Sequence, residues 1–170
     1  MQPRQRVLIL TRDSISAGRR YPNVWTSTIA EKTFVDTNIL VYAYDIDSGA
    51  KHERAKRLLI GLWEGGVGVV STQVLQEFYV TVTRKLAKPI SKRAAREVVA
   101  TYEVWEVFRP GAIDISAASE TEERFRLSFW DALIITAARR CRATSLLSED
   151  LQDGMVIDSL TISNPLLDVA

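Results

Sequence analysis

Cysteine and histidine are almost absent from this sequence. The single cysteine, Cys141, excludes a disulfide within the chain and fits a reducing compartment, so we expect a cytoplasmic protein. The single histidine, His52, leaves no histidine–cysteine cluster for zinc, and a histidine-dependent triad would have to use that residue. Most zinc and cysteine or serine triad chemistries are therefore poorly supported.

Long apolar runs and a strong net charge are also missing. No stretch approaches the roughly 20 apolar residues that span a bilayer, so no membrane partner is expected. The formal net charge of +1 neither indicates nor excludes nucleic acid, because a mixed surface can still carry a basic patch. With 170 residues, 46% of them hydrophobic and 25% charged, the chain has the size and composition of one globular domain.

The N-terminal segment differs from the rest in charge. Residues 1–33 contain six basic and two acidic side chains, a charge of +4, whereas the remainder has 16 basic and 19 acidic side chains, a charge of −3. The apolar run at 7–10 is too short for a signal-peptide core. We predict that residues 1–32 are a basic extension, either flexible or an artefact of a true start near residue 31, and that residues 33–170 form the domain. The alternative is a basic arm that contacts RNA.

From residue 33 onward, short apolar runs alternate with helical patterns. The runs predict strands at 33–36, 67–71, 105–108, 143–148 and 161–163. The helical patterns, with their caps and stop signals, predict helices at 38–44, 51–64, 72–86, 92–102, 116–126 and 130–140. Strands that alternate with helices indicate an α/β domain with a central, mostly parallel sheet of four to five strands, covered on both faces.

Four acidic residues occupy related places in this layout. Asp36 ends the first strand, and Glu77 lies one to two turns into the helix after the second. Asp131 is near the start of the helix at 130–140, and Asp150 follows the strand that ends at Ser148. The carboxyl ends of parallel strands and the helix starts that follow them share one edge of the sheet. We therefore expect the four carboxylates to meet in one cleft.

Each acid alone has a plainer interpretation. Asp36 and Asp131 are suited to a helix start, where backbone N–H groups favour negative charge, and Glu77 suits a solvated helix position. Asp150 competes with its neighbours Glu149 and Asp153. Four such coincidences along one sheet edge are much less probable than one.

Carboxylates packed closely together repel one another, and some stay protonated, unless a cation lies among them. Mg²⁺, with Mn²⁺ as a possible substitute, is the natural occupant of an all-oxygen site. Such an ion lowers the pKa of a bound water and neutralises charge on a phosphate. The acids therefore predict metal-assisted phosphodiester hydrolysis, for which neither histidine nor cysteine is needed.

The ordered motifs around these acids resemble the PIN domain family, and specifically the VapC-like toxins of type II toxin–antitoxin pairs. The resemblance covers about residues 33–167. It lies in residues 35–40 (Val-Asp-Thr-Asn-Ile-Leu), 71–78 (Ser-Thr-Gln-Val-Leu-Gln-Glu-Phe), 129–132 (Phe-Trp-Asp-Ala), 148–154 (Ser-Glu-Asp-Leu-Gln-Asp-Gly) and 162–166 (Ile-Ser-Asn-Pro-Leu). The resemblance implies a PIN-like three-layer α/β/α sandwich. One departure is the long lead before the first acid, since such toxins usually begin within a few residues of it.

The resemblance implies a Mg²⁺-dependent endoribonuclease with a small antitoxin protein as partner, RNA as substrate and a homodimeric assembly. Asp36, Asp131, Glu77 and Asp150 would then be the catalytic, metal-binding acids. Ser148 would be their small hydroxyl partner.

Polar and basic neighbours complete the predicted site. Thr37 and Asn38 are predicted to hold the Asp36 carboxylate from behind the metal. Basic side chains near the cleft are candidates for an RNA backbone contact, the alternative being a solvated helix end and loop: Arg84, Lys85, Lys88 and Lys92.

Two other functions remain as alternatives. A catalytically idle PIN-like module would bind RNA or a protein without cleavage, although such a module has no need to gather this much negative charge. A phosphatase or nucleotide-binding protein is less well supported. Asp45 and Asp47 lie in a turn after a helix, and Gly65 and Gly66 precede a strand, the wrong side for a phosphate-binding loop.

Overall fold

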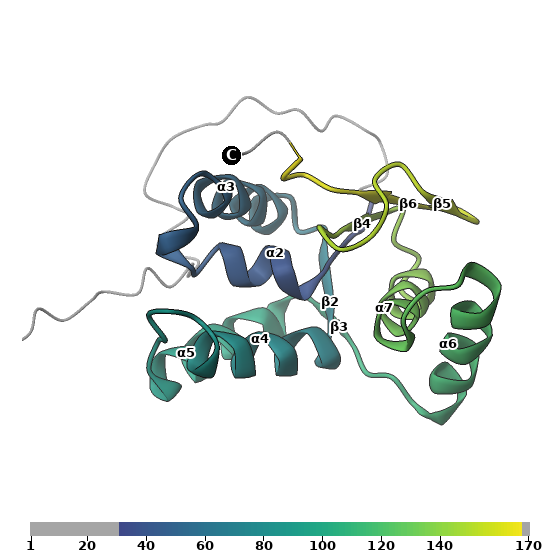
Figure 1. Ribbon diagram of the computed structural model, residues 1–170, viewed down its shortest axis with the longest axis horizontal. Coiled ribbons are helices and arrows are strands. Elements are labelled where there is room, and N and C mark those ends of the chain that lie inside the picture. Colours follow the sequence, from purple (N-terminus) through teal and green to yellow (C-terminus); the bar gives the residue numbers. More distant parts are fainter. Residues whose placement is uncertain (1–30, 168–170) are drawn as a thin grey trace, which may run out of the picture.

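A computed structural model describes residues 31–167 of the chain (Figure 1). The predicted basic extension at 1–32 lies almost entirely outside these residues. Within them, no helix is long and apolar enough to cross a membrane.

The centre of the molecule is a six-stranded sheet in the order β3-β2-β1-β4-β6-β5. Every neighbouring pair is parallel except β5 with β6. The strands are β1 (Thr33–Val35), β2 (Gly68–Ser71), β3 (Glu106–Phe108), β4 (Ser145–Leu147), β5 (Val156–Ile157) and β6 (Leu160–Ser163). The predicted α/β class and mostly parallel sheet are confirmed, with one strand more than the four to five expected.

The additional strand is β5, which pairs with β6 in antiparallel fashion through Val156–Thr161 and Ile157–Leu160. It is only two residues long, and Val156 is exposed. A strand this short leaves no periodic pattern in the sequence, so its pairing becomes visible only in the folded chain.

The helices follow the predicted order with small shifts at their ends. They are α2 (Thr37–Tyr42), α3 (Ala50–Gly65), α4 (Thr72–Arg84), α5 (Lys92–Thr101), α6 (Ala112–Phe125) and α7 (Phe129–Arg140), with 3-10 turns η1 (Ile46–Ser48) and η2 (Tyr102–Val104). The largest shift is in α6, which begins at Ala112 rather than Ser116. Its first turn is fixed by Asp114, whose Oδ2 accepts from the Gly111 N–H at 2.9 Å.

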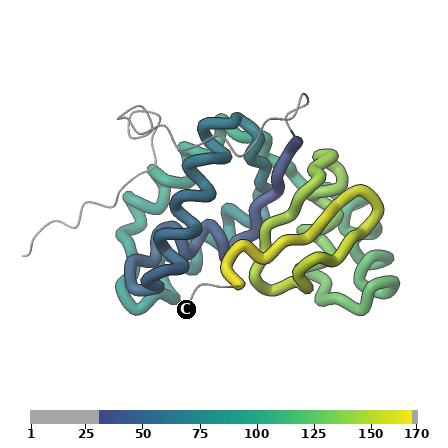
Figure 2. Tube along the Cα trace, turned by 90° about the horizontal axis from the view of Figure 1, so that it is seen from above, coloured from purple at the N-terminus to yellow at the C-terminus, as the bar shows by residue number. Residues whose placement is uncertain are grey.

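The sheet and helices form the predicted layered arrangement. In Figure 1, α4 and α5 lie on one side of β2 and β3, and the packed pair α6 and α7 lies on the other. Viewed from above in Figure 2, β1 runs between the helices drawn in purple to teal and the C-terminal strands drawn in green to yellow. The middle of β1 is fully buried at Phe34, which is in register with Val69 of β2 and Leu146 of β4.

The chain reverses its direction across the sheet next to β1. From β1 it proceeds to β2 and β3 on one side, then crosses back to β4 and β6 on the other. The point where strand order reverses therefore lies between the carboxyl ends of β1 and β4. In open α/β sheets this is where a crevice forms and ligands bind.

Candidate active site

Asp36 is the most buried of the four acids. It follows β1 directly, caps the N-terminus of α2, and is only 4% exposed. Its carboxylate accepts from the Thr37 N–H at 2.6 Å and from the Ser148 hydroxyl at 2.6 Å. Ser148 comes from the end of β4, so the two strands at the reversal point are joined through this carboxylate.

Burial raises the pKa of Asp36 to about 6, in spite of the hydrogen bonds from Ser148 and Thr37 that lower it. The negative charges of Asp150 and Glu77 contribute to the same upward shift of this pKa. No ion pair among residues 31–167 includes Asp36. The carboxylate is thus poorly compensated as an anion, and a bound cation would compensate it.

Asn38 links Asp36 to Asp150. Its amide nitrogen lies 3.0 Å from Asp150 Oδ2 and 3.4 Å from Asp36 Oδ2, and its Oδ1 accepts from the Glu149 N–H at 3.3 Å. Ser148 Oγ also accepts from the Asp150 N–H at 3.2 Å. Asp150 itself is exposed, so the group of carboxylates opens to solvent on this side.

Glu149, the alternative to Asp150 as the fourth acid of the site, has a partner outside the network. It forms an ion pair with Lys51 of α3. Burial works against its ionisation, but hydrogen bonds from Lys51 and Tyr42 hold the pKa of Glu149 below its usual value. The geometry therefore places Asp150, rather than Glu149, beside Asp36.

Glu77 joins the same network from α4. Its Oε2 accepts from the Thr37 hydroxyl at 2.9 Å, and its Oε1 accepts from Gln73 Nε2 at 3.0 Å. The Thr37 side chain thus holds Glu77, while only its backbone N–H holds Asp36. Ser71 places the helix by capping α4, where its Oγ accepts from the Val74 N–H at 3.3 Å.

Asp131 lies in the first turn of α7 and has a different partner. Ser128 caps this helix, donates to Asp131 Oδ2 at 2.7 Å and accepts from the Asp131 N–H at 3.2 Å. The preceding residue connects it to the network, because Gln73 Nε2 lies 3.5 Å from the Trp130 carbonyl oxygen. The described part of the chain shows no hydrogen bond from Asp131 to the other three acids.

Gln73 is a member of the network that the sequence interpretation missed. It is 6% exposed and lies between Glu77 and the start of α7. Its spacing of four residues from Glu77 puts both side chains on one face of α4, the signal that could have identified it. Its Oε1 is buried and has no hydrogen-bond partner within residues 31–167.

The oxygen donors gathered here suit a hard divalent cation. Within residues 31–167 no three carboxylates are already arranged to hold a metal ion. The donor set nonetheless fits one, since it consists of carboxylates and an unpaired amide oxygen, and it includes a buried carboxylate that lacks a cationic partner. Asp36, Glu77, Asp131 and Asp150 are the residues that would hold it.

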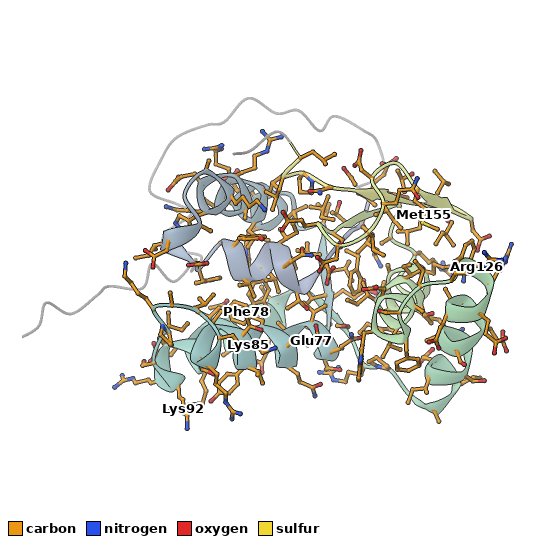
Figure 3. The ribbon with its side chains drawn as sticks, in the orientation of Figure 1. Glu77, Phe78, Lys85, Lys92, Arg126 and Met155 are labelled. Carbon is orange, nitrogen blue, oxygen red and sulfur yellow. The ribbon has the colours of Figure 1, made fainter. Side chains whose placement is uncertain are left out.

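The four basic residues predicted to contact RNA lie away from the strand ends. Arg84 ends α4 about two turns beyond Glu77, Lys85 caps that helix, and Lys92 begins α5. Figure 3 shows Lys92 well to one side of Glu77. Lys88 pairs with Asp47 at 2.7 Å. The structure does not bring these residues together with the acids.

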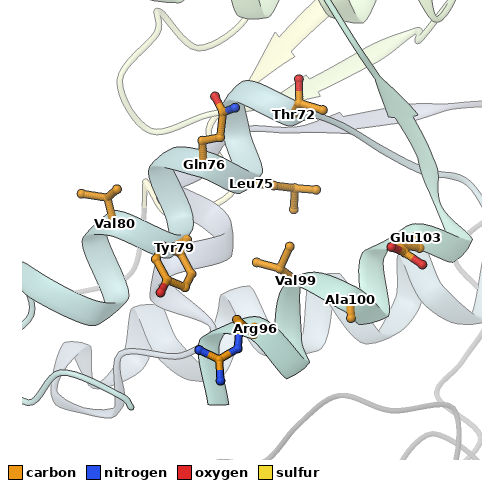
Figure 4. Close-up of a pocket in the computed structure, with 9 residues that line it drawn as sticks. All are labelled: Thr72, Leu75, Gln76, Tyr79, Val80, Arg96, Val99, Ala100 and Glu103. Carbon is orange, nitrogen blue, oxygen red and sulfur yellow. The ribbon is translucent and has the colours of Figure 1, made fainter. Parts of the chain in front are cut away.

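A separate groove of about 620 Å³ runs between α4 and α5 (Figure 4). Its walls are mainly apolar, and none of the four acids lines it. The apolar part includes Leu75, Tyr79 and Val99, while Arg96 of α5 and Glu103 of η2 contribute opposite charges to the lining.

The fold is an α/β domain in which carboxylates gather where the strand order of the sheet reverses. Residues 33–152 match the PIN domain family, and the chain belongs to that family. PIN domains are a family of nucleases that usually bind a divalent metal. No curated protein sequence matches the chain.

Solved structures with the same fold come from toxin–antitoxin systems. A toxin–antitoxin complex from Klebsiella pneumoniae is 19% identical with a TM-score of 0.57, covering 79% of this chain and 98% of that one. Mycobacterium tuberculosis VapC20, a sarcin–ricin loop cleaving toxin, is 25% identical with a TM-score of 0.53, covering 68% and 87%. VapBC2 from Rickettsia felis, bound to a fragment of promoter DNA, is 20% identical with a TM-score of 0.54, covering 78% and 97%.

Proposed function

We propose that this PIN domain is a Mg²⁺-dependent endoribonuclease that acts as the toxin of a VapBC-like pair. The observation that carries the proposal is the hydrogen-bond network that gathers Asp36, Glu77 and Asp150 at the reversal point of the sheet. The likeness to VapC20, described as a sarcin–ricin loop cleaving toxin, supports RNA as the substrate. Mn²⁺ is expected to replace Mg²⁺, because both are hard cations with oxygen ligands.

Each residue of the network has a task in such a reaction. When bound, the divalent ion supplies a water of lowered pKa and neutralises charge on the phosphate. Asp36 and Asp131 are the principal ligands in this proposal, with Glu77 and Asp150 completing the set. Ser148 and Asn38 orient Asp36 and Asp150, and such supporting hydrogen bonds typically contribute 10- to 100-fold to metal affinity or activity.

The partners proposed are RNA, a small antitoxin and a second copy of the chain. The Klebsiella and Rickettsia structures are toxin–antitoxin assemblies, which supports an antitoxin partner. The groove between α4 and α5 supports the homodimer. A two-fold axis across α5 would set Arg96 of one copy against Glu103 of the other, so that the apolar groove is covered and the charges are paired.

Cleavage of a purified RNA in the presence of Mg²⁺ tests the nuclease. We expect Asp36→Asn and Asp131→Asn each to lower the rate by about a hundredfold or more, because each removes a metal ligand. The matched control is Asp158→Asn, which removes an exposed carboxylate that pairs with Arg139, outside the network. It should cleave at the wild-type rate.

Undiminished cleavage by both variants would contradict this assignment of the site. Tight RNA binding by the wild type without cleavage under Mg²⁺ or Mn²⁺ would instead favour an idle RNA-binding module.

A further inference from the structure

Trp130 is an exposed tryptophan next to the candidate active site. It is 60% exposed, whereas Trp63 and Trp105, the other tryptophans among residues 31–167, pack with the main core. An indole ring contributes a large apolar area when it is covered, and its flat face can stack on another planar ring.

The position of Trp130 is fixed from two sides. Its carbonyl oxygen lies 3.5 Å from Gln73 Nε2, the same nitrogen that donates to Glu77, and Asp131 follows it in the chain. Its ring meets the Phe129 ring edge-on, with centroids 5.4 Å apart, and Phe129 packs on a small buried cluster formed with α6. The indole is therefore presented to solvent from a well-anchored helix start, whose backbone contacts the glutamine that holds Glu77 and whose next residue is Asp131.

The negative charge of the four acids makes an uncharged contact with RNA useful for binding. Four carboxylates repel a phosphodiester backbone in the absence of metal, and the predicted basic residues lie at the far end of α4. Stacking of a base on an aromatic ring does not depend on charge, and it works with any of the four bases because each has a flat π-face. It requires an unpaired base, because bases in a duplex are already stacked on one another.

We propose that Trp130 is a stacking platform for an unpaired base of single-stranded RNA, next to the nucleotide whose phosphodiester meets the acids. The proposal rests on the proposed ribonuclease function and makes single-stranded segments the preferred substrate. Trp130 is in this sense a positioning residue.

Fluorescence titration tests the stacking directly. The full chain carrying Asp36→Asn, in EDTA, is titrated with an unstructured oligoribonucleotide and with a blunt duplex of the same sequence. We expect the single strand to quench tryptophan emission, and Trp130→Phe to remove the quenched component while it retains part of the affinity. Trp130→Ala should raise the Kd roughly 5- to 100-fold, as the loss of one stacked base does elsewhere.

The matched control is Ile113→Ala on α6, which removes another exposed apolar side chain, 73% exposed. It should leave the Kd unchanged. Equal affinity of Trp130→Ala and its parent would overturn the proposal. So would a change of oligomeric state accompanying the loss of affinity, since Trp130 would then be covered by protein rather than RNA.

Cleavage by chains with an intact Asp36 separates this proposal from the function on which it rests. Trp130→Ala should raise KM with a smaller change in kcat, and Trp130→Phe should restore most of the loss. If the wild type cleaves no RNA while the quench still depends on Trp130, the nuclease proposal fails and the stacking stands. If the wild type cleaves and Trp130→Ala has the wild-type KM, the stacking fails alone.

Discussion

Asp36 combines burial with negative neighbours, an arrangement that is costly to the metal-free fold. The folded carboxyl group has a pKa of about 6, against 3.8 in an unperturbed chain. Between these values the folded protein holds a proton that the unfolded chain has released. The free energy of unfolding therefore falls as pH rises through this window, by about 3 kcal/mol in total, and the loss is complete above pH 7.

Asp36→Asn removes this titration and should change how stability depends on pH. In EDTA, we expect the free energy of unfolding of the wild type, relative to the variant, to fall between about pH 4 and pH 7 and then to stay constant. The variant should be the more stable protein near pH 7, even though it is inactive. Urea unfolding at a series of pH values measures the difference, and a difference independent of pH would contradict the burial of this charge.

At the scale of single elements, β2 depends on a glycine for close packing. A Cβ on Gly68 would lie 2.4 Å from the ring of Trp105, which is buried against Trp63 and Tyr102. A rigid ring enclosed by other rings cannot move aside. Gly68 is therefore required by contact between a strand backbone and an indole, rather than by its own backbone dihedrals.

Gly68→Ala should destabilise the fold by about 1–3 kcal/mol, the usual cost of overpacking a core. Gly61→Ala is the matched control, because Gly61 lies in α3 with nothing within 4 Å of an added Cβ. That change should stabilise the helix by roughly 0.5–1 kcal/mol. The urea midpoints of the two variants should move in opposite directions, and an unchanged midpoint for Gly68→Ala would show that Trp105 can shift.

The elements also show why sequence predicted much of this fold and where it stopped. β1 and β2 are buried on both faces, so they appear as apolar runs, and their helices carry caps such as Ser71 and Ser128. The start of α6 was missed because its cap, Gly111, has no side chain. Periodicity shows which side chains share a face of one helix, as Gln73 and Glu77 do, but not which side chains of different elements meet, so the Thr37–Glu77 hydrogen bond could not be expected.

At the scale of the whole molecule, the apolar groove between α4 and α5 is the surface proposed for a homodimer. Val80 lines it and is 37% exposed, so Val80→Arg should place a charge in the interface without disturbing the core. We expect this variant to sediment as a monomer where the wild type sediments as a dimer. Ile113→Arg, an equally polar change at a residue 73% exposed on α6, should remain dimeric. Dimers of unchanged stability in Val80→Arg would exclude the groove as the interface.

The acids come from both halves of the sheet, and this links metal binding to the stability of the whole domain. Asp36 follows β1 and Glu77 lies in α4, on one side of the reversal point, while Asp131 lies in α7 and Asp150 follows β4, on the other. A cation held by all four would join the halves and stabilise the folded state by mass action. At about 100 times its Kd it would contribute roughly 2.7 kcal/mol.

We therefore expect saturating Mg²⁺ to raise the Tm of the wild type by roughly 5–10 °C, reversibly with EDTA. Asp131→Asn should lose most of this shift, and Asp158→Asn should retain it. A full shift in Asp131→Asn would remove Asp131 from the ligand set and leave the three hydrogen-bonded acids as the site. Compared with the wild type, Asp36→Asn should have a higher Tm without metal near pH 7, but its Tm should respond little to Mg²⁺. That combination cannot arise from damage to the fold, because a misfolded variant would lose stability in both conditions.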